Sequence, residues 1–494
     1  MRLFDKFFIY FSLATFVAGE PYLAPNDPFI RHETRLLSDG GKLSGLQNTW
    51  PLDLGGIAGM NSGSSYQLPH NLLGNKISEE SDSGWSNFST YLGFADDRST
   101  ARGFSPKPRS SFVTNGSISW MNDRFAGKLS LNAFYGMQKD WKGREDDGLA
   151  LDGSYLAARL GNWSASFGQV DRWWGPAWDG SLILSTNARP LPAISIDRRV
   201  PEPFETKWLS WLGPWSAHSF IGRLEKERTV ANPYLWGMRG EIRPTIVKGL
   251  EIGFFRMIQL GGEGRPEGFG TWADAFLSQD NYGGNTGKND RSQEPGNQLA
   301  GIDLRWQVFD APIALYGQIV GEDEDKFLPN ALMFQYGIES WQKLSNSSIR
   351  VFLEYADLTT HWWTDRDYSE NSPYNISYNH HIYNDGYRYH GRPIGHWADQ
   401  DSRILSFGGL LLRNNGIGWG FTGRNGDLNE DDAGSSTVSN GIASSYSSFD
   451  IYNFREYRTY DLSVNTSIGW ESIKPSNKSR NDGLTAFVGI TRNF

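Results

Sequence analysis

From Trp85 onward, apolar and polar residues alternate with a period of two, and this pattern continues to the C-terminal Phe494. The same alternation recurs at 128–135, 300–307, 349–355 and 460–470. Segments of about ten residues with one apolar and one polar face suit either a half-buried soluble sheet or an outer-membrane barrel. The pattern therefore predicts an all-β fold and leaves these two architectures open.

The connections between the expected strands alternate between short and long. Tight turns are expected at 122–123, 161–162, 213–214, 310–312 and 414–416, and long connections at 95–110, 137–150, 258–296 and 357–402. Short periplasmic turns and long outer loops are typical of outer-membrane barrels. Aromatic residues also bracket many of the strands, as interfacial girdles require. These features favour a transmembrane antiparallel β-barrel over a soluble all-β fold.

The parity of the strands constrains their number. A first count from Trp85 gives an odd number of strands, which would leave Phe494 outside the cell. Bacterial barrels have even numbers of strands with both ends in the periplasm. We therefore predict one further strand at 441–449, which turns at Asp450 and runs back through 457–470. The result is a barrel of about 18 strands, with a water-filled lumen unless the lumen is plugged.

The N-terminal part of the chain does not follow the period of two. Residues 1–19 have the charge, apolar stretch and small residues of a secretory signal peptide, although a short buried helix is an alternative. Asp27 followed by Pro28 predicts a helix start, and 40–41 is a glycine pair that predicts its end. We expect 20–84 to be a small helical or irregular periplasmic segment, and 85–494 to be the barrel with long extracellular loops.

Charge and composition exclude some classes of function. The 47 Lys and Arg residues and 56 Asp and Glu residues give a formal net charge of -9, which argues against nucleic-acid binding. The chain contains no cysteine, so it has no disulfides. His380, His381, His390 and His396 match no familiar metal-ligand spacing, and the acidic runs at 322–325 and 427–432 lack EF-hand spacing. We predict neither a metal nor a cofactor.

The segment 171–199 concentrates tryptophans, paired charges, glycine and proline between two expected strands. Indole faces stack on sugar rings, while arginine, aspartate and asparagine hydrogen-bond to hydroxyl and carboxylate groups. One interpretation is a polysaccharide-binding site at the outer mouth. The other is a constriction that closes the lumen, with Arg172 paired to Asp171 or Asp179, and the two roles are compatible. The candidate residues are Arg172, Trp173, Trp174, Trp178, Asp179, Asn187, Arg189, Arg198 and Arg199.

The long outer connection contains a second candidate region at 361–396, which is dense in tyrosine, histidine and asparagine. Tyrosine combines a rigid apolar ring with a hydroxyl group, which suits polar recognition. The alternative is a structured loop that lies inside the barrel. The candidate residues in the motif that ends this region are Tyr387, Arg388, Tyr389 and Arg392, and Tyr374, Tyr378 and Tyr383 precede them.

Three motifs carry a resemblance to a known family: Asp-Arg-Trp-Trp-Gly-Pro at 171–176, Asn-Ala-Arg-Pro-Leu-Pro at 187–192, and 387–396. Together with 27–31 and 49–52, they resemble the capsule-assembly Wzi family over nearly the whole mature chain. The resemblance implies an outer-membrane barrel of about 18 strands with a periplasmic helical segment. It also implies a surface lectin that attaches exported capsular polysaccharide to the cell.

We therefore expect a non-enzymatic lectin of the bacterial outer membrane that anchors capsular or related surface polysaccharide. The alternatives are a diffusion channel with an open lumen and a polysaccharide-modifying hydrolase. Asp171, Asp179, Glu202 and Glu205 could supply the acid and base of such a hydrolase, although any long acidic chain offers such pairs. We expect a monomer surrounded by lipid and lipopolysaccharide, with lumenal polar groups that include Asp303, Arg305, Arg350 and Glu354.

Overall fold

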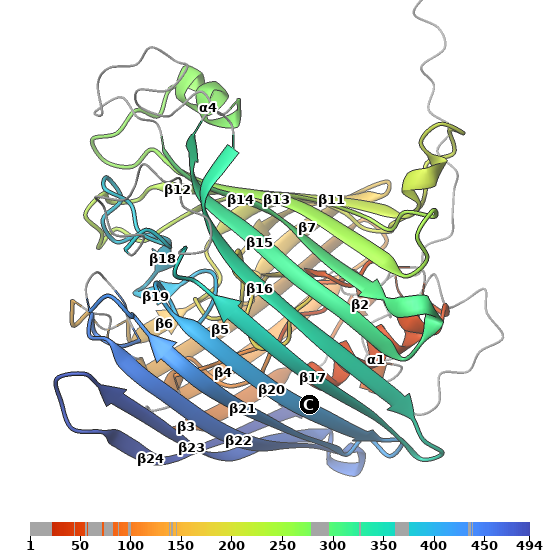
Figure 1. The fold of residues 1–494 in the computed structure, drawn as a ribbon. Coiled ribbons are helices and arrows are strands. Elements are labelled where there is room, and N and C mark those ends of the chain that lie inside the picture. Colours follow the sequence, from red (N-terminus) through yellow and green to blue (C-terminus); the bar gives the residue numbers. More distant parts are fainter. Residues whose placement is uncertain are drawn as a thin grey trace, which may run out of the picture.

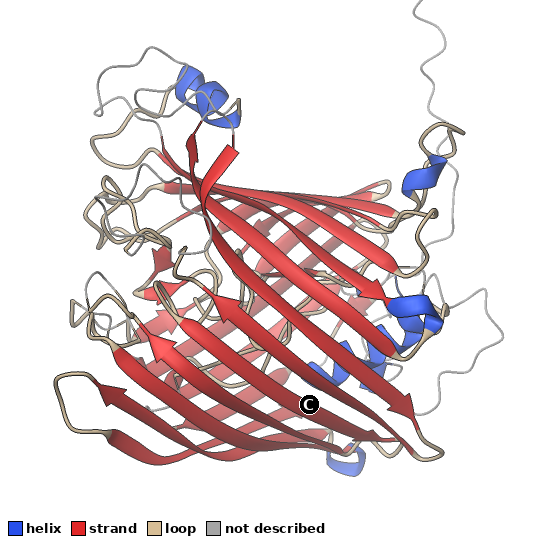
Figure 2. Cartoon of the chain, in the orientation of Figure 1, coloured by secondary structure: helices blue, strands red, loops and turns tan. Residues whose placement is uncertain are grey.

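The computed structural model describes residues 22–43, 45–54, 57, 72–73, 83–86, 88–96, 100–137, 139, 142–144, 146–277, 296–325, 328–360, 375–432, 436 and 438–494. Strands dominate this part of the chain, and helices are few and short (Figure 2). The expected signal peptide at 1–19 lies outside the described residues. Within the described part, none of the helices combines the length and the apolarity that a membrane-crossing helix needs.

The strands form one closed antiparallel barrel (Figure 1). The last strand, β24, pairs with β3, so the sheet has no free edge. Two short strands do not count as separate positions around the barrel. The strand β2 (Gly84–Trp85) pairs with β4, which also pairs with β3. The strand β6 (Gly148–Ala150) pairs with β5, which also pairs with β7. Eighteen strand positions result, which confirms the predicted barrel. They are β3 (Ser89–Ala95), β4 (Ser110–Met121), β5 (Phe125–Met137), β7 (Tyr155–Leu160), β8 (Trp163–Gly168), β10 (Ala193–Arg198), β11 (Trp215–Arg223), β12 (Tyr234–Ile242), β13 (Leu250–Leu260), β14 (Gly296–Gln307), β15 (Ile313–Asp325), β16 (Leu328–Lys343), β17 (Ser347–Asp357), β20 (Arg403–Arg413), β21 (Gly418–Leu428), β22 (Ser444–Tyr457), β23 (Leu462–Pro475) and β24 (Asn481–Asn493).

The two ends of the barrel differ in their connections. The end on the right in Figure 1 has mostly short turns, two of which include the 3-10 turns η3 (Val308–Asp310) and η5 (Arg458–Tyr460). The 3-10 turn η1 (Ser210–Leu212) lies in a longer connection at this end. The other end has the long connections and the helix α4 (Phe269–Phe276). Since outer-membrane barrels have short periplasmic turns, the long-loop end is the outer end. The expected tight turn at 213–214 is part of a longer connection, 199–214.

One predicted turn is wrong. Asp450 lies in the middle of β22, a single strand that runs to Tyr457, and the chain turns only at 458–461. The side chain of Asp450 points into the lumen, where it accepts hydrogen bonds from Lys107 and Arg424. Aspartate favours turns because its side chain can bond to nearby backbone, but here two cations distant in sequence satisfy the carboxylate within a strand.

The two faces of the strands differ in polarity as the alternation predicts. On β14, Ile302 and Leu304 are exposed on the outside of the barrel, whereas Asp303 and Arg305 are buried in the lumen. The exposed outward side chains form an apolar band around the barrel, and the band suits a hydrocarbon environment. Its members include Leu129, Leu131, Phe254, Ile319, Leu353, Phe407, Ile451 and Ile468.

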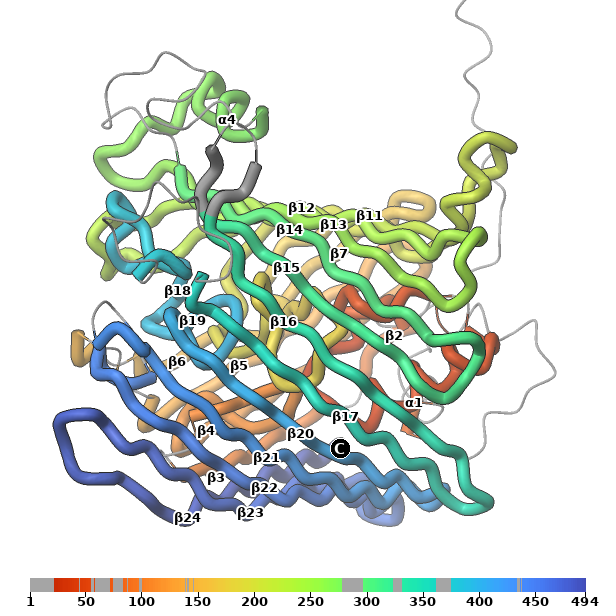
Figure 3. Tube along the Cα trace, viewed as in Figure 1, coloured from red at the N-terminus to blue at the C-terminus, as the bar shows by residue number. Residues whose placement is uncertain are grey.

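The N-terminal helix α1 (Pro28–Asp39) lies inside the barrel near the short-turn end, as the red tube in Figure 3 shows. The Asp27 side chain accepts hydrogen bonds from the backbone N–H groups of Phe29 and Ile30, and the helix ends at Gly40, so both predicted helix ends are confirmed. Most side chains of α1 are buried, including the polar ones. The helix is therefore polar because it packs against a polar lumen.

Candidate functional site

The connection between β8 and β10 enters the lumen instead of passing over the outer mouth. Its short strand β9 (Trp173–Trp174) pairs with β1 (Thr49–Trp50) of the N-terminal segment inside the barrel. Trp173 and Trp174 are each only 1% exposed. Of the two positions that the sequence allowed for these rings, the structure shows the lumenal one.

Trp178 and Asp179 join this segment to the barrel wall. Their backbone N–H groups donate to the Glu354 carboxylate, and the Trp178 indole donates to Glu339 over 2.8 Å. Asp179 also forms an ion pair with Arg424 at 2.6 Å. Three strands from one side of the barrel wall, β16, β17 and β21, therefore hold the segment in place.

The predicted partner of Arg172 is wrong. Its guanidinium donates to the carbonyl of Val170 and to the hydroxyl of Ser195, while Asp171 pairs with Arg109 at 2.5 Å. Arg172 also lies over the ring of Phe220, with its Cζ 4.6 Å from the ring centroid. Asp171 does not pair with Arg172 because the side chains of neighbouring residues in an extended chain point to opposite sides.

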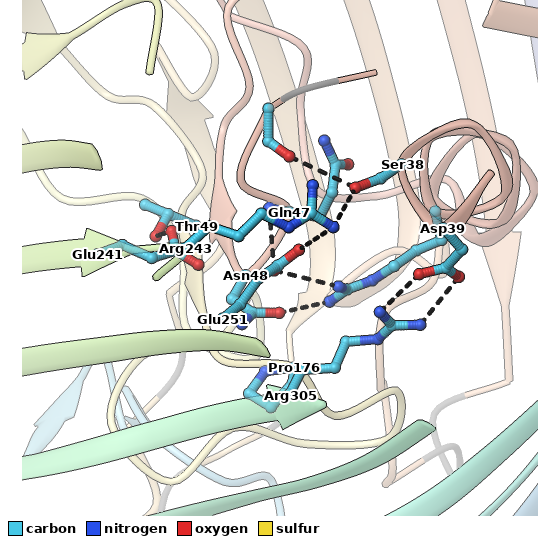
Figure 4. A network of polar contacts seen from close by, with 12 residues as sticks. Ser38, Asp39, Gln47, Asn48, Thr49, Pro176, Glu241, Arg243, Glu251 and Arg305 are labelled. Carbon is cyan, nitrogen blue, oxygen red and sulfur yellow. Dashed lines mark hydrogen bonds and ion pairs between the residues drawn. The ribbon is translucent and has the colours of Figure 1, made fainter. Parts of the chain in front are cut away.

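Four buried charges attach α1 to the lumenal wall. Asp39 accepts two hydrogen bonds from Arg305, at 2.7 and 2.9 Å, and Figure 4 shows this contact. Arg305 and Arg350 also bind Glu339, at 2.6 and 2.8 Å, and Arg350 lies 3.5 Å from Asp39. The cluster holds two carboxylates and two guanidinium groups, all almost completely buried. It is balanced in charge.

A second group of contacts fixes the chain that follows α1 (Figure 4). Arg35 donates to Asn48 over 2.6 Å and pairs with Glu251 of β13 at 3.6 Å. The Thr49 hydroxyl donates to Glu241 of β12 over 2.6 Å. One turn earlier on the same face of α1, Arg31 donates to the carbonyl oxygens of Pro176 and Ala177. The N-terminal segment and the 171–190 segment therefore plug the lumen together.

The outer connection between β17 and β20 covers this plug at the outer end. Arg388 is its central group: the guanidinium binds Asp399 with both carboxylate oxygens, and it also donates to Asn379 and Gln400. The hydroxyl groups of Tyr378 and Tyr387 donate to backbone carbonyls of the 171–190 segment. The described part, 375–402, is thus a structured loop inside the outer mouth. His361 to Tyr374, which the sequence also singled out, lie outside the described residues.

Three outer connections meet at the rim of the mouth, in partly exposed charged groups. Arg189 binds Asp152 through two hydrogen bonds of 3.0 Å and also contacts Asp146, which lies 2.9 Å from His390. Lys142 and Arg144 both pair with Asp385. Of these rim residues, the sequence predicted Arg189 as a candidate, and it also predicted Tyr389, the neighbour of His390. It gave no signal for the aspartates, because their partners are distant in sequence.

A small pocket lies next to this rim. It is lined by Thr100, Lys139, Asn187, Gly391, Arg392, Pro393, Trp397 and Val438. Its volume of about 10 Å³ admits about one water molecule. Arg392 donates to Asn187 over 3.2 Å, and burial together with nearby Arg109 lowers the pKa of Arg392 to about 10. The lining contains two cations and no carboxylate.

The other predicted residues lie away from the mouth. Arg198 and Arg199 are at the short-turn end, where Arg199 pairs with Asp53 at 2.5 Å and Arg198 lies over the Trp215 ring. Glu202 and Glu205 are also at this end, whereas Asp171 and Asp179 bind arginines in the interior. The carboxylates considered for glycoside cleavage are therefore not gathered at one site. Within the described residues, His, Asp and Glu side chains form no group that could hold a metal ion.

Asp401 gives the outer loop a pH dependence. Burial raises the pKa of Asp401 to about 8, even though the Asn375 N–H donates to it over 2.7 Å. The folded protein therefore holds the Asp401 proton more tightly than the unfolded chain, in which the pKa is 3.8. The contribution of Asp401 to the stability of the loop is complete below pH 3.8 and is lost as the pH rises through about 8. We expect hydrogen exchange in 375–402 to be slower at pH 6 than at pH 9 after correction for intrinsic rates. The variant D401N should lose most of this difference; an unchanged difference would contradict the assignment.

Comparison with known proteins agrees with this architecture. The chain matches the family model for "Capsule assembly protein Wzi" over residues 86–483. It is 32% identical to an uncharacterized 55.8 kDa protein in the cps region of Klebsiella pneumoniae. The 348 matched residues are 68% of this chain and 66%, just under two thirds, of that protein. The solved structure of Wzi from Escherichia coli superposes with a TM-score of 0.80 at 25% identity, covering 96% of this chain and 99% of that one. That protein is described as an outer-membrane, carbohydrate-binding β-barrel involved in group 1 capsule assembly. By its sequence and its fold, the chain belongs to the Wzi family of capsule assembly proteins.

Proposed function

We propose that this outer-membrane barrel binds capsular or related polysaccharide at its outer mouth and anchors the polymer to the cell surface without cleaving it. One observation carries the proposal: buried ion pairs fill the lumen, while charged groups from several outer loops are partly exposed at the mouth. The description of the E. coli relative as a carbohydrate-binding barrel of capsule assembly supports it.

The binding surface consists of the rim around Arg189 and the adjacent pocket. Arg189 and His390 supply hydrogen bonds at the rim, the buried Tyr389 packs against His390, and Asn187 and Arg392 line the pocket. Charge-assisted hydrogen bonds from arginine to carboxylates are strong, so the pocket favours an acidic substituent on a sugar. Trp173, Trp174 and Trp178 act as packing residues of the plug. Arg198 and Arg199 lie too far from the mouth to contribute.

Each such contact is weak, and avidity explains how a polymer is retained. A polysaccharide repeats the same unit many times, so a segment that dissociates rebinds, and neighbouring barrels hold the same chain at several points. Linked binding events of this kind raise overall affinity without new contacts. The protein works as a monomer in this scheme, embedded among outer-membrane lipid and lipopolysaccharide, because anchoring needs only one mouth per barrel.

The plug argues against a diffusion channel. An open channel requires a continuous aqueous path, and here two inner segments are bonded to strands on several sides of the lumen. The purified protein in planar bilayers should therefore pass little current. A steady conductance of porin size would favour the channel instead.

The decisive experiment is deletion of the gene in its own encapsulated strain. We expect the mutant to make a normal total amount of polymer but to release most of it into the medium, because export does not depend on the anchor. Cell-bound and released polysaccharide are measured separately, and a plasmid copy should restore the bound fraction. Polymer that remains on the mutant cells would contradict anchoring, and polymer that becomes shorter when incubated with purified protein would indicate a hydrolase.

A further inference from the structure

The helix α4, at the upper left of Figure 1, lies against the outside of the barrel wall. The Trp272 ring is 5.5 Å from Tyr234 and 5.6 Å from Trp236, and Phe276 stacks on Trp236 at 5.7 Å. Tyr234 and Trp236 belong to the outward face of β12, because Leu235 between them packs in the lumenal core. The helix therefore covers a surface that in other parts of the barrel faces lipid.

The strand surface beneath α4 carries two polar side chains beside the apolar Ile258 and Leu260, which are fully buried under the helix. On the outward face of β13, the exposed Phe254 is followed by Arg256, which donates to the carbonyl oxygens of Ala275 and Phe276 over 2.8 and 2.7 Å. Gln298 on β14 also donates to the Ala275 carbonyl, over 3.4 Å. The two side chains thus bind the C-terminal end of the helix, where cations and donors are favourable.

Arg256 indicates the depth of α4 in the membrane. An arginine on the lipid face of a barrel costs about 2–4 kcal/mol at the bilayer midplane but only about 0–1 near the interface. Tyrosine and tryptophan are enriched at that same interface. Arg256, Tyr234 and Trp236 together therefore place α4 at the outer edge of the apolar band, at the level of the lipid headgroups.

Part of the apolar surface of α4 stays exposed although the helix packs on the barrel. Ala275 is fully buried against the wall, whereas Phe269 is 90%, Phe276 52% and Leu277 56% exposed. Exposed aromatic side chains in water are unfavourable and usually mark an interaction surface. Phe269 and Phe276 are seven residues apart, about two helical turns, so they lie on one side of the helix.

We infer that α4 is an interfacial helix that inserts Phe269, Phe276 and Leu277 among the acyl chains of the outer leaflet. The occupant is lipid because α4 packs on the apolar outer face of the barrel: Phe254 and Ile302 are exposed on that face, and Ile258 and Leu260 continue it under the helix. Interfacial helices bury their apolar side by about 5–10 Å into the boundary between headgroups and acyl chains. A second protein is a poorer fit, since three side chains supply far less than the roughly 800 Å² per partner of a stable interface.

This contact would tether the described part of this outer connection, 261–277, on the lipid side of the mouth. It does not depend on the proposed function, because it involves the outside of the wall and not the polysaccharide surface. An anchored helix at this position would also resist vertical movement of the barrel, since it joins the rigid wall to the headgroup layer.

The absence of cysteine makes a site-specific test direct. The full-length variants F269C and F276C are each labelled with an environment-sensitive fluorophore and reconstituted into vesicles of lipopolysaccharide and phosphatidylglycerol. L353C, in the apolar band, is the lipid-exposed control, and K226C, in another outer connection, is the aqueous control. Quenching by lipids that carry a nitroxide on the acyl chain is then compared among the four positions.

The expected result is quenching at 269 and 276 at least half as strong as at 353, and several times stronger than at 226. Quenching as weak as at 226 would overturn the inference. Heat-modifiable migration on gels verifies that each variant forms the barrel, and L277C replaces either phenylalanine variant that does not. A loss of capsule retention in these variants is not expected, so the test is independent of the anchoring experiment.

Discussion

Replacing Asp39 by alanine is expected to detach the N-terminal segment from the lumenal wall and to open the lumen to ions. The change removes one carboxylate from a buried cluster in which two carboxylates balance Arg305 and Arg350. Removing one partner of a buried ion pair costs about 3–5 kcal/mol, because the remaining charge is left uncompensated. We expect frequent channel openings in planar bilayers, in contrast to the little current of the unmodified protein.

A double variant separates this electrostatic cause from a general loss of packing. D39L/R305M removes one negative and one positive charge and leaves Glu339 and Arg350 as a matched pair at 2.8 Å. Because replacing both members of a buried pair by apolar residues is often neutral, the double variant should close the lumen more fully than D39A alone. Equal conductance in the two variants would contradict the charge-balance explanation.

An exposed pair at the same end of the barrel supplies the control. Lys248 and Asp310 are 2.7 Å apart, and both side chains are well exposed. Surface ion pairs contribute about 0–1 kcal/mol, so D310N should leave the conductance unchanged. If D310N opened the lumen as D39A does, the effect would not be specific to the plug.

The barrel was predictable from the sequence because its determinants are local. Alternation along each strand shows which side chains face lipid, as for Ile302 and Leu304, and glycine or asparagine marks most turns. Asp450 was misinterpreted because its partners, Lys107 and Arg424, come from other parts of the chain. The number of strands was nevertheless correct, since the requirement that both chain ends lie on one side does not depend on where each turn falls.

The plug was only partly predictable. The aromatic composition of 171–178 indicates a packed or binding segment, but its position inside the lumen depends on Thr49 and Trp50, which precede it by more than a hundred residues. The contact between Asp39 and Arg305 spans 266 residues. No local pattern specifies such pairs, so the sequence left closure and binding open as alternatives.

Arg388 is expected to be the residue of the outer loop whose loss most reduces polysaccharide retention. Its guanidinium binds Asp399, Gln400 and Asn379, and so ties the beginning and the end of the described loop together. R388A leaves Asp399 buried without its cation, again at a cost of about 3–5 kcal/mol. We expect the loop to unfold locally, to become sensitive to added protease, and to release polymer nearly as completely as the deletion strain does.

R392Q distinguishes support of the loop from contact with the polymer. Arg392 lines the pocket and donates there to Asn187, and a glutamine at this position keeps an amide donor but loses the charge. The loop should therefore stay resistant to protease, while the fraction of bound polymer falls several-fold because a charge-assisted contact is replaced by a neutral one. R392Q preserves the loop, whereas R388A does not. A fall in bound polymer in R392Q without cleavage of the loop therefore assigns polysaccharide binding to the pocket. Full retention in R388A with a cleaved loop would instead place the polysaccharide contact on another part of the mouth.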